Sequence, residues 1–287
     1  MGLTIHFQLR LPSTWSLDQV LAAMAKLWQA AKSLPFQSQS NMITLSEHHI
    51  ERAIAGHNES PWRWACIQHT RYHCYRYDTM GRPYSVSKDA DGTGTHTMSV
   101  PATTLVGFTC VPGNGCEVVN VFVGKYPNSI MVDCKGDQHG YPSGKRRLMM
   151  EDPFCWTASA FCKTQYASQP CEGGVTNFLR CHLLVIALLD TARELGFTVE
   201  VDDEGQYDER RSIPDLIREV GSWNTMIAGV GASLRAEFGN DVQTATSTEE
   251  LAEPVDRQIA TALGDDVLDL IRRTKGTTVA MEANHGR

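Results

Sequence analysis

The stretch VGFTCVPGNGCEVVNVFVGKYP, residues 106–127, decides the fold class of this protein. Two apolar segments flank residues 112–115, where Asn114 and Gly115 form a pair that readily adopts the positive φ angles of a tight turn. The pattern therefore predicts a β-hairpin. Its two strands run antiparallel, whereas the parallel strands of a doubly wound fold are joined by crossover helices.

Strands and helices are also predicted on both sides of the hairpin. Alternation of apolar and polar residues predicts strands, while apolar residues three and four apart predict helices. The predicted elements are a strand at 3–9, a helix that begins with the capping box Ser16 to Gln19 and ends before Pro35, a strand at 156–167, a helix at 177–196 closed by Gly196, and a strand at 197–205. We therefore predict an α+β fold with a mostly antiparallel sheet, helices packed on one side, and a C-terminal helix.

The domain organisation follows from where the apolar patterns stop. The chain has 287 residues, enough for one large domain, and we assign residues 1–240 to a single α+β domain that closes with a helix from Ser212 to Phe238. Residues 241–253 are read as a linker. Residues 254–274 are predicted to form a C-terminal amphipathic helix, and residues 275–287 are read as a flexible tail.

Charge and cysteine content limit the classes of function. The formal net charge is −7, which argues against a surface built to neutralise phosphates, and the basic run Lys145 to Arg147 is read as a solvated loop. Nine cysteines are an odd count, which favours reduced thiols. The N-terminus resembles no signal sequence, and the longest apolar run, 183–189, is too short for a membrane span. We expect a cytoplasmic protein that does not enter membranes.

The segment WACIQHTRYHCYRY, residues 64–77, contains two cysteines and two histidines, residue types that bind metal ions. On a helix, Cys66, His69 and His73 would share one face and could bind zinc. On a strand, the two histidines would point away from Cys66 and lie roughly 13 Å apart, at about 3.3 Å per residue. The aromatic composition favours the strand, so we expect no metal. The tyrosines and arginines of this segment also leave open RNA or single-stranded nucleic-acid binding as a third functional reading.

Cysteine chemistry supplies an alternative function, that of a cysteine-dependent or metal-assisted hydrolase. Cys181 is expected near the start of its helix, where the helix dipole lowers a thiol pKa. Cys162 is the other nucleophile considered, with His139 or His182 as its base.

The favoured reading is an accessory or binding protein that acts through contacts with another protein and needs no cofactor. Two-residue periodicity in 156–167 buries one face of a strand and leaves Lys163 and Gln165 on the other, beside Phe161. Asp203 and Glu204 end a later strand that we expect in the same sheet. These four polar residues are the predicted partner-binding positions, although acidic residues after a strand also serve as solvated turns, or as ligands for a cation.

Overall fold

The computed structural model describes residues 3–55, 67–73, 75–77, 83–85, 95–127, 129–134, 144–149, 156–238 and 265–275. Its centre is a seven-stranded sheet in the order β13-β1-β12-β9-β8-β2, with β3 also paired to β8. Every pairing between the described strands is antiparallel. The sheet strands are β1 Thr4–Leu11, β2 Ser38–Gln39, β3 Ile43–Ser46, β8 Thr104–Val111, β9 Val119–Lys125, β12 Trp156–Lys163 and β13 Thr198–Asp203.

The predicted hairpin is confirmed as β8 and β9, with Cys110 opposite Val119 at its closed end. Gly115 in the connecting turn has a φ of 71°, a conformation in which a side chain is strained. Within the hairpin, Gly107 lies against Phe122 and the carbonyl of Val121 so closely that an added Cβ would collide with both. The close contact of these two strands therefore depends on a glycine.

Helices α1 Leu17–Lys32 and α3 Gly174–Glu194 provide the main core against the sheet. The predicted capping box is present, because Gln19 N donates to Ser16 Oγ and Ser16 N donates to Gln19 Oε1. Gly196 has a φ of 90° just after α3, as predicted for its C-terminal turn. The core-facing side chains that these helices cover are Ile5, Phe7, Leu9 and Leu11 of β1 and Leu3 just before it.

The remaining helices are α2 Glu47–Ala55, α4 Tyr207–Arg210, α5 Ile213–Phe238 and α7 Asp265–Arg273, with short 3-10 helices η1 Gln165–Ser168 and η2 Pro170–Glu172. Helix α7 packs on α3 through buried Val267, Leu270 and Ile271, and Asp266 pairs with Arg180 at 3.4 Å. A C-terminal helix is therefore present within the predicted range 254–274. The expected linker 241–253 lies outside the described residues, as does the tail except for Lys275.

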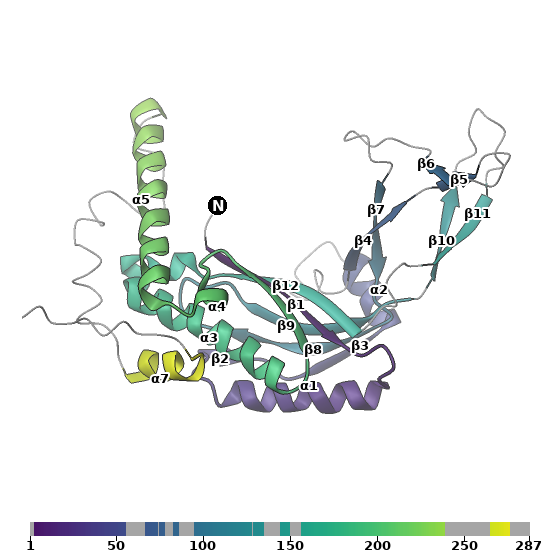
Figure 1. The fold of residues 1–287 in the computed structure, drawn as a ribbon, viewed down its shortest axis with the longest axis horizontal. Helices are drawn as coiled ribbons and strands as arrows, with labels where there is room; N and C mark the ends of the chain where they lie inside the picture. Colours follow the sequence, from purple (N-terminus) through teal and green to yellow (C-terminus); the bar gives the residue numbers. More distant parts are fainter. Residues whose placement is uncertain are drawn as a thin grey trace, which may run out of the picture.

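Three small two-stranded ladders lie apart from the main sheet: β4 Ile67–His73 with β7 Thr95–Pro101, β5 Tyr75–Tyr77 with β6 Pro83–Ser85, and β10 Ser129–Cys134 with β11 Gly144–Met149. They project beyond one end of the sheet (Figure 1). The strand reading of His69 to His73 is confirmed by β4, while Cys66 lies outside the described residues. The solvated-loop reading of Lys145 to Arg147 is wrong, because all three residues lie in β11, paired to β10.

The order of the central elements explains why one sheet face is covered. Helix α1 follows β1, and helix α3 follows β12. Both helices cross the same face of the sheet before the chain returns to it, as Figure 1 shows. The centre of the sheet consists of two split β-α-β units. The first unit is β1, α1 and β9, and the second is β12, α3 and β13. Strand β8 is added beyond β9. The opposite face of β13, β1 and β12 thus receives neither α1 nor α3.

Candidate functional site

Three neighbouring strands present alternating side chains on this second face of the sheet, which we call the open face. His6 of β1 lies between Asp202 of β13 and Phe161 of β12. In the next row, Gln8 lies between Glu200 and Ser159. Because side chains alternate along a strand, these residues point away from the core that their neighbours fill.

The open face is hollowed where these rows meet. The hollow has a volume of about 490 Å³ and is lined by His6, Phe7, Gln8, Ser159, Ala160, Phe161, Glu200, Val201 and Asp202. Phe161 is 49% exposed, and its ring centroid lies 5.9 Å from that of His6. An aromatic ring held at this exposure inside a hollow is available to contact another molecule.

Carboxylates give the hollow its charge. Glu200 pairs with Arg10 at 3.1 Å, at the margin of the hollow. Asp202 is exposed and forms no ion pair with another residue of the described chain. The hollow therefore combines an aromatic ring with a carboxylate whose charge is not balanced within the described residues.

The four predicted partner-binding residues have different environments. Lys163 is half-buried at the end of β12, with its ammonium 4.8 Å from the Tyr166 ring, and Glu204 accepts a hydrogen bond from Thr4 N at 2.7 Å. Gln165 does not lie on the exposed strand face, because β12 ends at Lys163 and the chain turns into η1. Its side chain is buried and accepts from Leu3 N at 2.9 Å.

Asp203 is also buried, and it points to the side opposite the open face. It accepts hydrogen bonds from the backbone N–H groups of Gly205, Tyr207 and Asp208, at 2.8, 2.8 and 3.0 Å. His182 Nε2 lies 3.1 Å from Asp203 Oδ2 and must be the donor, because a carboxylate only accepts. Burial alone would raise the pKa of Asp203, but the interaction with His182 and these backbone donors lower it to about 2.

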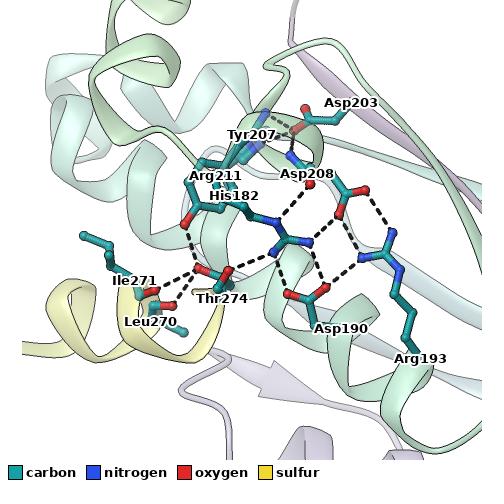
Figure 2. A network of polar contacts seen from close by, with 10 residues as sticks. All are labelled: His182, Asp190, Arg193, Asp203, Tyr207, Asp208, Arg211, Leu270, Ile271 and Thr274. Atoms are coloured by element: carbon teal, nitrogen blue, oxygen red, sulfur yellow. Dashed lines mark hydrogen bonds and ion pairs between the residues drawn. The ribbon is translucent and has the colours of Figure 1, made fainter. Parts of the chain in front are cut away.

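A second group of charges continues from this pair to the C-terminal helix (Figure 2). The guanidinium of Arg211 contacts both oxygens of Asp190 at 2.6 and 2.9 Å, and that of Arg193 contacts both oxygens of Asp208 at 2.9 Å. Cross-contacts from Arg211 to Asp208 and from Arg193 to Asp190 close the ring. We call these four residues the charge ring.

The charge ring reaches α7 through Thr274. Arg211 donates to the Thr274 carbonyl at 3.1 Å, and the hydroxyl groups of Tyr207 and Thr274 are hydrogen-bonded at 2.7 Å. Figure 2 shows these contacts joining α3, α4 and the end of α7. Together with the buried pair of His182 and Asp203, they hold β13, and therefore one side of the open face, in a fixed position.

The side chains expected for cysteine hydrolysis are not arranged for that chemistry. Both ring nitrogens of His182 already have partners, Asp203 and the hydroxyl of Thr164 at 3.0 Å, and all three residues are buried. Cys162 is buried, and its thiol donates to the Glu117 carbonyl at 3.3 Å. His139 lies outside the described residues.

The expectation that the helix dipole lowers the pKa of Cys181 is wrong. The neighbouring Cys116 thiol and burial raise that pKa instead. Helix α3 begins at Gly174, so Cys181 lies beyond the first turn, where the dipole acts. Within the described part of the chain, no three or more His, Cys, Asp or Glu side chains are grouped to hold a metal ion.

Sequence reasoning recognised the exposed side of β12 but did not place His6, Glu200 and Asp202 beside it. The signal for Asp202 was present, because Val199 and Val201 alternate with Glu200 and place Asp202 on the polar side. The pairing of β1 with β12 brings Thr4 opposite Lys163, and its pairing with β13 brings Ile5 opposite Asp203, and no local pattern predicts such distant contacts.

No family model, curated protein or solved structure matches this chain. One helix of the described residues, α3, is long and apolar enough to cross a membrane, with a mean hydropathy of 1.4. In the folded protein 67% of the most apolar 18-residue stretch of α3 is buried. The position of α3 in the core therefore accounts for its apolar composition. The function must therefore be argued from the open face itself.

Proposed function

We propose that this protein is a binding protein whose open face takes a basic segment of another protein, with an apolar side chain of that segment placed against Phe161. The observation that carries the proposal is the exposed ring of Phe161 in a hollow that also contains Asp202. A cytoplasmic location, expected from reduced cysteines, belongs to the same proposal.

The chemistry of the open face supports a basic and apolar partner segment. Apolar contact with an aromatic ring in a hollow supplies much of the affinity of protein interfaces, whereas complementary charge sets partner choice and association rate. A Lys or Arg of the partner would pair with Asp202. The same carboxylates disfavour nucleic acid, because they repel phosphates, and the net charge of −7 acts in the same direction.

The first prediction concerns peptides selected for binding to the full-length protein from a random library. We expect the selected peptides to be enriched in Lys or Arg next to an aromatic or aliphatic residue. Phe161→Ala should weaken their binding about tenfold or more, because truncation of a central aromatic contact costs about 2 kcal/mol. Asp202→Lys should weaken binding by repulsion, and wild-type affinity should fall as salt is added. Isothermal titration calorimetry measures all three effects.

Glu194→Lys is the matched control, because Glu194 is an exposed carboxylate at the end of α3, away from the open face. Its binding should stay within about twofold of wild type, and circular dichroism should show that every variant is folded. Selection of acidic peptides, or equal affinity of wild type and Phe161→Ala, would contradict the proposal.

A further inference from the structure

Three thiols from distant parts of the sequence meet beside the hairpin turn. Cys116 follows the turn between β8 and β9, Cys162 lies in β12 and Cys181 lies in α3. Cys162 Sγ lies 3.3 Å from the carbonyl oxygen of Glu117, the residue that follows Cys116, and Cys181 Sγ lies against Gly113, at the start of the same turn. Cys116 is half-buried, whereas the other two are buried, so Cys116 is the member of the group that solvent reaches.

Each of the three thiols lies close to an oxygen atom near the hairpin turn. Cys116 Sγ lies 3.9 Å from the Thr164 carbonyl, and Cys181 Sγ lies 3.7 Å from Asn177 Oδ1. A Cβ added to Gly113 would lie 2.8 Å from Cys181 Sγ, so the glycine allows the turn to lie directly over this thiol. The turn is also held on α3 by Arg180, which donates to the Pro112 carbonyl.

We propose that this group is a thiol–disulfide exchange site, at which Cys116 reacts with a small-molecule disulfide and passes the new disulfide to Cys162 or Cys181. In the first step, the Cys116 thiolate attacks one sulfur of oxidised glutathione, forming a mixed disulfide and releasing one glutathione thiolate. In the second, the neighbouring thiol loses its proton and attacks Cys116 Sγ, which releases the second glutathione. The protein loses two electrons and two protons, and one oxidised glutathione becomes two reduced molecules.

The presence of two neighbours distinguishes this site from an ordinary pair of cysteines. Either buried thiol can complete the second step, and the third thiol can then attack the resulting disulfide, so the bond can move between β12 and α3 with Cys116 as the shared member. Each product fixes the hairpin turn covalently to a different element. Neither product requires a change in the pairing of β8 with β9.

The electrostatics of the site set the speed of the first step. The neighbouring Cys162 thiol, burial and the charge of Glu117 raise the pKa of Cys116 well above its ordinary range, whereas the neighbouring Cys181 thiol opposes this. The positive charge of Arg180 lowers the pKa of Cys181, but this effect is smaller than the increase caused by the Cys116 thiol and burial. Little thiolate exists at neutral pH, so oxidation is slow there and should accelerate about tenfold per pH unit between pH 7 and 9.

The test is incubation of the full-length protein with oxidised glutathione, followed by mass-spectrometric mapping of cross-linked peptides. We expect links from Cys116 to Cys162 and to Cys181, with the tenfold rise in rate per pH unit. Cys181→Ser should leave only the link to Cys162, and Cys162→Ser only the link to Cys181. Cys116→Ser should remove both links.

Cys171→Ser is the matched control, because Cys171 is exposed and lies outside the group; this variant should form both links at the wild-type rate. Circular dichroism of each variant checks that the fold is retained. The proposal is overturned if Cys116 carries only a glutathione adduct, if a link between Cys162 and Cys181 forms at the wild-type rate in Cys116→Ser, or if the rate does not depend on pH.

Discussion

Asp203 determines the local structure at the end of β13 through a single carboxylate. Its two oxygens accept three backbone N–H groups and face the His182 ring, so they hold the turn into α4. Asp202 is adjacent in sequence but lies on the opposite side of the strand. Two neighbouring aspartates therefore have separate tasks: one is structural, and the other is available for binding.

The second prediction concerns the contribution of Asp203 to stability. Asp203→Asn should lower the free energy of unfolding by about 3 kcal/mol at pH 7, because it leaves buried partners of the carboxylate unmatched. Asp202→Asn, on the exposed side, should change it by no more than about 0.5 kcal/mol. Urea unfolding followed by circular dichroism gives both values, and equal effects of the two substitutions would refute this role of Asp203.

The third prediction is the pH dependence of the difference in unfolding free energy between wild type and Asp203→Asn. The pKa of Asp203 is lowered to about 2 in the folded protein, from an ordinary value of 3.8. The stabilisation is therefore fully present above about pH 4 and is lost as the pH falls through 2, a change of about 2 kcal/mol. The gap between wild type and Asp203→Asn should narrow over this range in urea titrations. A gap that stays constant between pH 5 and 2 would contradict the lowered pKa.

At the scale of elements, the fourth prediction is that alanine substitutions at two glycines change stability in opposite directions. Gly107→Ala should destabilise the protein by about 1–3 kcal/mol, because its Cβ would overlap with Phe122 and the next strand. Gly229→Ala should stabilise it by up to about 1 kcal/mol, because an added Cβ meets no atom of another described element within 4 Å and alanine favours the helix α5. Thermal unfolding measures both shifts, and a stable Gly107→Ala variant would show that the hairpin can separate.

The elements that the sequence predicts well are those with local causes. The hairpin needs only its turn and two apolar segments, and α1 needs only its capping box and apolar stripe. The strand prediction failed at Gln165 because periodicity cannot show where a strand stops, and here the chain turns two residues earlier. The basic residues of β11 were read as a loop because their pairing with β10 is not visible in composition.

The candidate site was predictable only in part, for the same reason. The polar side of β12 follows from alternation within one strand, and it correctly included Phe161. The hollow requires the relative register of β13, β1 and β12, which depends on contacts across most of the chain. The inward position of Asp203 requires its contact with His182, on a helix of the core.

At the scale of the whole molecule, the charge ring attaches the C-terminal helix to the rest of the fold. Arg211 contacts Asp190 of α3, Asp208 of α4 and the carbonyl of Thr274 after α7. Its backbone has a φ of 52°, uncommon for a residue with a side chain. Helix α7 is also attached by apolar contact with α3, by the pair of Arg180 with Asp266, and by the hydrogen bond between the hydroxyl groups of Tyr207 and Thr274.

The fifth prediction tests this attachment. Arg211→Lys should lower the free energy of unfolding by about 1–3 kcal/mol, because lysine cannot contact both oxygens of Asp190 and reach Thr274. Amide hydrogen exchange should also increase within α7. Arg218→Lys is the control, since Arg218 pairs with Asp215 on an exposed part of α5 and should change stability by less than about 0.5 kcal/mol. Unchanged exchange in α7 of Arg211→Lys would argue against the role of the charge ring.

The central place of β1 has a consequence for synthesis on the ribosome. Thr4 contacts Glu204, 200 residues later in the chain, and both neighbours of β1 come from the second half of the sequence. At about 5–20 residues per second, the first strand waits roughly 10–40 seconds for its second neighbour to be translated. Its buried side chains, including Leu3, Ile5 and Phe7, are without their final contacts during that time. The nascent chain should therefore depend on chaperones that shield the apolar side chains of β1 until β13 has been translated.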